Sequence, residues 1–139
     1  MNCKIKKLTK TAIIPTKGHI NDNCYDLYAD EITIIGPYQT RKVSTNIALQ
    51  PDKGYGFVVR ARSGKSLQGV IVGGGEVDNN YRGNIGVILH NMTCNELVVN
   101  PGDRIAQMRP IKLIEVNFCV VDELEETKRG ENGFGSTGI

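Results

Sequence analysis

Apolar residues recur along the chain in short runs, and no window keeps the helical spacing over the ten or so positions that a helix needs. Turn signals such as Gly36-Pro37 and Asn100-Pro101-Gly102-Asp103 separate these runs. This pattern predicts an all-β fold, a jelly-roll-like sandwich or barrel. The expected strands are Lys4–Leu8, Tyr25–Ala29, Ile32–Ile35, Lys42–Leu49, Gly56–Arg60, Val70–Val72, Asn84–His90, Leu97–Val99, Arg104–Met108 and Leu113–Val121.

Two of the expected strands differ in how their apolar residues alternate. In the segment 84–91, Ile85, Val87 and Leu89 share one face and Ile88 lies on the other, so both faces are apolar. We therefore expect this strand to be central in its sheet or to lie against another subunit. The segment 113–121 alternates cleanly and is predicted to be a half-buried strand, with one face formed by Ile114, Val116, Phe118 and Val120.

The character of the chain changes after Val121. A charged stretch, Asp122 to Lys128, leads into a terminus rich in Gly, Ser and Asn that is too poor in core-forming residues to pack by itself. A chain of 139 residues fits one domain. We predict a β jelly-roll core over residues 1–121 and a flexible glycine-rich C-terminal arm over residues 122–139.

Charge and hydropathy argue against two classes of partner. The formal charge is only +2, and the densest basic run, Lys4 to Lys10, is interrupted by Ile5 and Leu8. An exposed strand edge explains this run better than a phosphate-backbone footprint, so we expect no nucleic acid partner. No N-terminal apolar stretch resembles a signal peptide or a membrane span, so we expect no membrane association.

The cysteines indicate the compartment. They are widely separated and form no CxxC pair, so the default interpretation is buried free thiols in a reducing compartment. We therefore expect a cytoplasmic protein, or a nuclear or host-cytoplasmic one if the source is viral, and not a secreted protein. The four cysteines are Cys3, Cys24, Cys94 and Cys119.

Two glycine-containing motifs are misleading. Gly133 to Gly138 fits the GxGxxG pattern, but the chain ends one residue later, so the helix that a dinucleotide site requires is missing. Gly64-Lys65-Ser66 resembles the end of a P-loop, but Val59 stands where the first glycine is required. The isolated histidines His19 and His90 support neither a zinc site nor a Ser-His pair.

Five segments, in this order and spacing, resemble the five motifs of the trimeric dUTPase family. Any one of them alone is weak evidence, but the resemblance extends from residue 23 to the C-terminus. The segments are Asn23-Cys24-Tyr25-Asp26-Leu27-Tyr28-Ala29, Arg62-Ser63-Gly64, Gly75-Glu76-Val77-Asp78-Asn79-Asn80-Tyr81-Arg82-Gly83, Gly102-Asp103-Arg104-Ile105-Ala106-Gln107, and Arg129-Gly130-Glu131-Asn132-Gly133-Phe134-Gly135-Ser136-Thr137-Gly138.

The resemblance implies an enzyme that hydrolyses dUTP to dUMP and pyrophosphate, keeping uracil out of DNA and supplying dUMP for dTTP synthesis. It implies Mg²⁺ as the cofactor, which Asp26 reaches through bound water. It also implies a homotrimer with shared active sites, in which the C-terminal arm of one subunit closes over a neighbouring subunit's site. A glycine-rich arm that cannot pack on its own domain can gain order in this way.

The resemblance also assigns roles to individual residues. Asp78 is the candidate general base, although an Asp before Asn-Asn more often caps its own turn. Tyr81 would pack against deoxyribose and exclude a 2′-hydroxyl, and the hairpin from Gly75 would recognise uracil with backbone groups. Phe134, beside Gly135, would stack on uracil from the arm. The implied phosphate contacts are Arg62, Ser63, Gly64, Gln107, Arg129, Ser136 and Thr137.

Several positions depart from the family pattern without removing a proposed catalytic group. Cys24 replaces a usual Gly, Ala61 a usual Pro and Lys65 a usual Leu. Glu76 replaces an apolar residue two positions before Asp78, and we expect it to face solvent.

Two alternative functions remain open from the sequence. One is a dCTP deaminase of the same superfamily, and the other is a dUTP-binding regulatory module that hydrolyses little.

Overall fold

The computed structural model describes residues 1–131 of the chain, and over this part the fold is almost entirely β. The strands are β1 (Cys3–Lys7), β2 (Tyr25–Tyr28), β3 (Thr33–Ile35), β4 (Thr40–Ser44), β5 (Ile47–Pro51), β6 (Tyr55–Arg60), β7 (Val70–Gly73), β8 (Glu76–Val77), β9 (Gly86–Asn91), β10 (Leu97–Val99) and β11 (Arg104–Lys112). One short helix, α1 (Ser63–Leu67), joins β6 to β7. The predicted all-β class is confirmed.

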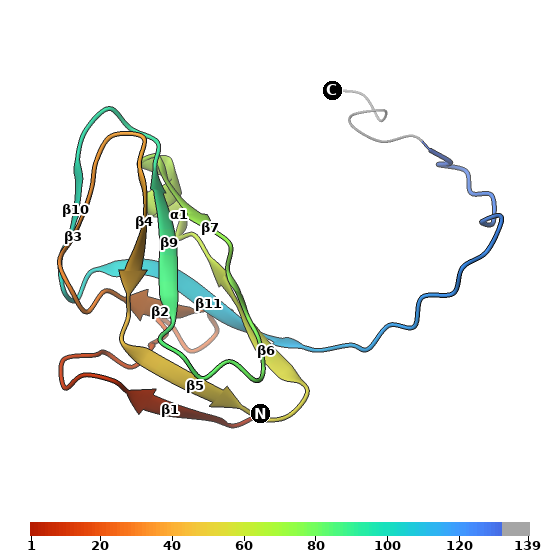
Figure 1. Cartoon of the computed structure of the whole chain (residues 1–139), viewed down its shortest axis with the longest axis horizontal. Coiled ribbons are helices and arrows are strands. Elements are labelled where there is room, and N and C mark those ends of the chain that lie inside the picture. The colour runs from red at the N-terminus through yellow and green to blue at the C-terminus, as the bar shows by residue number, and fades with distance from the viewer. Residues whose placement is uncertain (132–139) are drawn as a thin grey trace.

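The strands form small antiparallel sheets that pack around one core (Figure 1). The sheets have the strand orders β2-β11-β6-β8, β4-β9-β7, β1-β5 and β10-β3. Neighbours far apart in sequence, such as β2 beside β11, give the crossing connections of a jelly-roll-like sandwich. Apolar side chains from all of these sheets meet in the centre, the largest being Leu27, Ile35, Ile47, Ile85, Leu89 and Ile105.

Strand β9 has the central position that its two apolar faces predict. It is hydrogen-bonded to β4 on one side and to β7 on the other. Val87 and Leu89 are fully buried in the core, whereas Ile88 points the other way and is 39% exposed. A central strand with an apolar residue on its outer face fits the prediction made from the segment 84–91.

The expected strand Lys42–Leu49 is two strands, β4 and β5, separated at Asn46. Asn46 has a positive φ of 49°, which ends the pairing of β4 and redirects the chain. The Asn46 backbone N–H donates a hydrogen bond to Asn84 Oδ1, and Asn84 Nδ2 donates one to Asn46 Oδ1, both at 2.9 Å. Because Asn84 is distant in sequence, local alternation does not reveal this break.

The predicted strand Leu113–Val121 is wrong. Strand β11 extends to Lys112 instead of ending at Met108, and one last hydrogen bond joins the Leu113 N–H to the Gly54 carbonyl at 2.8 Å. The chain then leaves the sandwich as an extended segment (Figure 1). Phe118 on this segment is 93% exposed. The regular alternation of residues 113–121 therefore has no matching surface in the described part of the same chain.

The four cysteines are all free thiols, as predicted, but they are not buried. Cys3, Cys94 and Cys119 are exposed and Cys24 is half-buried. They occupy the edge strand β1, a turn, the outgoing segment and the loop before β2, and none of the four belongs to the buried core. Within residues 1–131, no helix is long and apolar enough to cross a membrane.

A carboxylate network ties the N-terminal loop to the break at Asn46. Asp30 accepts hydrogen bonds from the Thr9 hydroxyl and, at 2.9 Å, from the Asn46 amide. Burial by itself would raise the pKa of Asp30, but hydrogen bonds from Thr9, Asn46 and Thr11 and the charge of Lys7 together lower this pKa below its ordinary value. Asp30 therefore stabilises the fold in its charged form.

We expect Asp30→Asn to lower the free energy of unfolding at pH 7 by about 1 kcal/mol, the order of one net hydrogen bond. Because the pKa of Asp30 is lower in the folded state, its charged carboxylate stabilises the fold at pH values above the unfolded pKa of about 3.9. This contribution is lost as the pH falls through the folded-state pKa. The native and variant unfolding energies, measured in urea, should therefore converge near pH 2. The exposed neighbour Glu31 supplies the control Glu31→Gln, which should show no such convergence. An equal deficit for Asp30→Asn at every pH would contradict the account.

Candidate active site

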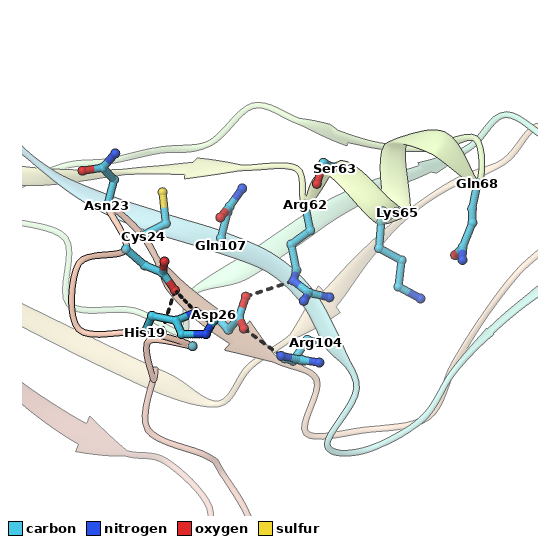
Figure 2. Close-up of a pocket in the computed structure, with 13 residues that line it drawn as sticks. His19, Asn23, Cys24, Asp26, Arg62, Ser63, Lys65, Gln68, Arg104 and Gln107 are labelled. Atoms are coloured by element: carbon cyan, nitrogen blue, oxygen red, sulfur yellow. Dashed lines mark hydrogen bonds and ion pairs between the residues drawn. The ribbon is translucent and has the colours of Figure 1, made fainter.

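Strand β11 brings three motif regions together because it lies between β2 and β6. Gln107 on β11 is directly opposite Asp26 on β2 and Arg60 on β6. Arg62 lies two positions after the end of β6, and Arg104 begins β11. These polar side chains, distant in sequence, therefore lie at one end of the sheet (Figure 2).

Asp26 is held between two arginines. Its Oδ1 accepts a hydrogen bond from Arg62 Nε at 2.9 Å, and its Oδ2 one from Arg104 Nη1 at 3.3 Å. Only 14% of the Asp26 side chain is exposed, so the carboxylate is compensated by charge-assisted hydrogen bonds rather than by bulk water. A charged residue that faces inward on a strand is unusual, and the two arginines compensate the charge of Asp26.

Arg104 is a site residue that the residue assignments from the sequence missed. The signal was present, because Arg104 belongs to the fourth motif segment, Gly102 to Gln107. The position of its partner Asp26, however, depends on the pairing of β2 with β11.

A cavity of about 690 Å³ opens beside this cluster. Its walls come from the loop 18–24, from the start of α1 and from β11 (Figure 2). Lysine and arginine side chains outnumber carboxylates among the lining residues, which suits an anionic ligand. The complete lining is Gly18, His19, Asp22, Asn23, Cys24, Asp26, Arg62, Ser63, Gly64, Lys65, Gln68, Arg104 and Gln107.

The segment predicted to bind phosphates lies in this cavity. Ser63 and Gly64 are exposed at the start of α1, and a Cβ added to Gly64 would meet no heavy atom within 4 Å. The backbone at Gly64 is therefore open to an incoming group. Gln107 donates a hydrogen bond from Nε2 to the Ala61 carbonyl at 2.8 Å, which fixes the loop that leads into Arg62 and Ser63.

The segment from Gly75 to Gly83, called the hairpin below, carries Asp78 and Tyr81 and is anchored to the rest of the fold. Its strand β8 pairs with β6 and not with β9, so it does not form the expected hairpin with the segment 83–89. The Asn79 side-chain amide donates to the carbonyls of Asp52 at 2.8 Å and Tyr55 at 2.7 Å. Arg82 donates to the Leu49 carbonyl at 3.3 Å. The side chains of Asn79 and Arg82 thus hold the turn between Asp78 and Tyr81 against the end of β5 and the start of β6.

Asp78 itself is exposed at the end of β8. Its backbone carbonyl accepts a hydrogen bond from the Tyr81 N–H at 3.1 Å, which closes the turn. Within residues 1–131 its carboxylate accepts no hydrogen bond, so the alternative role as a side-chain cap does not apply here. Glu76, two positions earlier, is also exposed, as expected from its neighbours.

Two glycines set the shape of this hairpin. Gly75 has a φ of +114°, and an added Cβ would lie 2.5 Å from the Val59 carbonyl oxygen. Its own carbonyl accepts a hydrogen bond from the Val59 N–H at 2.7 Å. At Gly83 an added Cβ would lie 2.3 Å from Tyr81 Oη, so the tyrosine folds over this glycine. Tyr81 then donates to the Asn84 carbonyl at 3.1 Å and remains 46% exposed.

The structure therefore brings some of the predicted site residues together and not others. Asp26, Arg62, Ser63, Gly64 and Gln107 share the cavity. The hairpin residues Gly75, Asp78 and Tyr81 do not line it, and Arg129 is exposed on the outgoing segment. The predicted contacts Phe134, Gly135, Ser136 and Thr137 lie outside the described residues.

Comparison with known proteins shows the family of this chain. The family model for dUTPase matches residues 10–138. The deoxyuridine 5'-triphosphate nucleotidohydrolase of Helicobacter pylori (strain Shi470) is 40% identical over 142 residues, with 100% of this chain and 98% of the relative covered. The corresponding protein of a Picosynechococcus species is also 40% identical, with 99% of each chain covered.

Solved structures agree with the sequence relatives. The dUTPase of Staphylococcus bacteriophage 80alpha with dUPNHPP superposes with a TM-score of 0.91 at 26% identity, and 99% of each chain is covered. The jelly-roll-like architecture of that protein is therefore shared along almost the entire length. Because the family model and the 40% identical relatives both span nearly the whole sequence, this chain belongs to the dUTPase family.

Proposed function

We propose that this protein hydrolyses dUTP to dUMP and pyrophosphate. The observation that carries the proposal is the cation-lined cavity around the Asp26–Arg62–Arg104 cluster, which three of the five motif segments build. The water oxygen forms a bond to the α-phosphorus, and the bond from that phosphorus to the bridging oxygen breaks. Pyrophosphate leaves with the electron pair, and the water proton passes to a base.

The cavity holds the phosphates in this proposal. Arg62 keeps free N–H groups beyond the Nε that binds Asp26, and Ser63 and the open backbone at Gly64 add donors. Gln107 also lines the cavity, beside the Ala61 carbonyl to which it donates a hydrogen bond. The protein itself takes little part in making and breaking covalent bonds. Positioning of the substrate and stabilisation of the phosphate charge therefore supply most of the rate enhancement.

The hairpin holds the nucleoside and the base. Asp78 accepts the proton of the attacking water, a role that suits an exposed carboxylate with no hydrogen-bond donor of its own in residues 1–131. Tyr81 packs on the deoxyribose and excludes a 2′-hydroxyl, and backbone groups from Gly75 onward select uracil. Arg129 and the arm residues Phe134, Gly135, Ser136 and Thr137 close over the bound nucleotide.

Magnesium fits the cavity as an ion that arrives with the substrate. Among residues 1–131, no group of three or more His, Cys, Asp and Glu could hold a metal. Asp26 is the carboxylate closest to the phosphate loop, and both its oxygens already accept arginine hydrogen bonds, which favours an outer-sphere contact through water. The ion would supply neutralisation of phosphate charge.

A homotrimer with shared sites explains why the cavity and the hairpin lie apart in one chain. The base and nucleoside residues of one subunit would complete the phosphate cavity of another. The exposed apolar residues of the segment 113–121 would be buried on a neighbouring subunit, and the arm over residues 122–139 would continue to that neighbour's site. Light scattering should give a molar mass three times that of the chain.

The test of the function is pyrophosphate release with Mg²⁺ from dUTP, dTTP, dCTP and UTP in parallel. We expect release from dUTP, with the other three slower by about 10²-fold or more, since a 5-methyl or 2′-hydroxyl would overlap the hairpin and the cytosine edge would mispair. Ammonia release from dCTP would support the deaminase alternative instead. Tight dUTP binding without turnover would support the regulatory module.

A further inference from the structure

Lys65 is a cation in the phosphate cavity to which the roles above assign nothing. It lies on α1, three positions after Arg62, and its half-buried side chain lines the cavity with Gln68 (Figure 2). Arg62 at the N-cap, Lys65 within α1 and Gln68 at the C-cap all line this wall of the cavity.

The other two cations of the cavity, Arg62 and Arg104, are paired with Asp26. The second carboxylate of the cavity, Asp22, accepts the His19 N–H at 2.7 Å and lies 3.6 Å from His19 Nδ1. Across residues 1–131, no carboxylate lies within 4.0 Å of the Lys65 ammonium. Lys65 is therefore the cavity's ammonium group that an arriving anion can pair with at no cost to an existing ion pair.

The position of the nucleoside residues indicates which part of the substrate Lys65 meets. Gly75 and Tyr81 do not line the cavity, so the cavity receives the phosphate end of the nucleotide and not the base. The β- and γ-phosphates are farthest from the nucleoside and carry most of the charge. We infer, resting on the proposed function, that the Lys65 ammonium binds the pyrophosphate half of dUTP and the pyrophosphate that leaves.

The binding affinities for pyrophosphate and for dUMP, measured separately, distinguish a contact to the pyrophosphate half from a general effect of Lys65 on nucleotide binding. Each of the two ligands is one half of the substrate. Calorimetric titration of the full chain with magnesium pyrophosphate should show roughly a tenfold to hundredfold weaker affinity in Lys65→Met, the loss of a charge-assisted contact. The affinity for dUMP should change by less than about twofold, because dUMP lacks the β- and γ-phosphates. The kcat/KM for dUTP should fall with the pyrophosphate affinity.

Three further variants sharpen the comparison. Lys65→Arg keeps the charge and should retain pyrophosphate affinity, and Lys65→Gln is a second neutral variant in case Lys65→Met folds poorly. Lys10→Met removes the same charge from an exposed position outside the cavity and should behave as the native chain. An unchanged pyrophosphate affinity in both neutral variants would overturn the inference, and so would an equal loss of dUMP affinity. Failure of the native chain to hydrolyse dUTP is a separate result that would overturn the proposed function.

Discussion

Asp78→Asn is expected to lower kcat for dUTP by about 10²- to 10⁴-fold, the range that a positioned general base contributes. The amide cannot accept the proton of the attacking water but has nearly the shape of the carboxylate. Because Asp78 is exposed and its carboxylate accepts no hydrogen bond from residues 1–131, the midpoint of thermal unfolding should stay within about 1–2 °C of the native value. Stopped-flow detection of pyrophosphate and a thermal melt measure the two quantities.

The matched control for this variant is Glu76→Gln. Glu76 is a second exposed carboxylate on the same hairpin, two positions before Asp78. It should retain kcat within a factor of about two, since surface substitutions away from a site have small effects. A loss in Glu76→Gln as large as that in Asp78→Asn would indicate that the hairpin needs negative charge in general, and would contradict a specific base at Asp78.

Gly75→Ala is expected to reduce both stability and activity. The φ of +114° strains any side-chain-bearing residue, and the new Cβ would lie 2.5 Å from the Val59 carbonyl oxygen, a backbone atom that cannot rotate away. Strain of about 1–3 kcal/mol and overpacking of about 1–3 kcal/mol together predict a loss of about 2–6 kcal/mol in the free energy of unfolding. Relief would require β8 to move away from β6, which would displace Asp78 and lower kcat/KM by about 10²-fold.

Gly102→Ala separates the effect of the positive φ from the effect of the contact with the Val59 carbonyl. Gly102 also has a positive φ, +86°, but an added Cβ there would meet no heavy atom within 4 Å. It should lose only the conformational contribution, about 1–2 kcal/mol, with kcat/KM unchanged. Urea unfolding and steady-state kinetics on both variants test the difference. Equal destabilisation in the two would show that the contact between Gly75 and Val59 is unimportant.

The strands with a strong local pattern could be predicted from the sequence, and those that depend on a distant partner could not. The apolar residues on both faces of β9 indicate its central position from the local sequence, although Ile88 on the outer face is 39% exposed in this chain. The division at Asn46 depends on Asn84, and the short β8 and α1 have no periodicity of their own. The segment 113–121 alternates like a strand, but alternation does not reveal whether its partner belongs to the same chain.

For the site as well, local motifs could be predicted from the sequence and contacts between distant residues could not. Resemblance placed Asp26, Arg62, Ser63, Gly64 and Gln107 in one site, and the pairing of β11 with β2 and β6 brings them to one cavity. Arg104 was missed because its role depends on which carboxylate the sheet register puts beside it. The roles of Asp78 and Tyr81 remain predictions, because neither residue lines the cavity formed by this chain.

The most direct test of the central claim is hydrolysis of dUTP in water enriched in ¹⁸O, with both products analysed by mass spectrometry. Attack on the α-phosphate places one ¹⁸O atom in dUMP and leaves pyrophosphate unlabelled, and this is the result we predict. Label in the pyrophosphate would mean that water attacks the β-phosphate. Formation of dUDP and inorganic phosphate would mean cleavage at the γ-phosphate, and either result would contradict the proposed reaction.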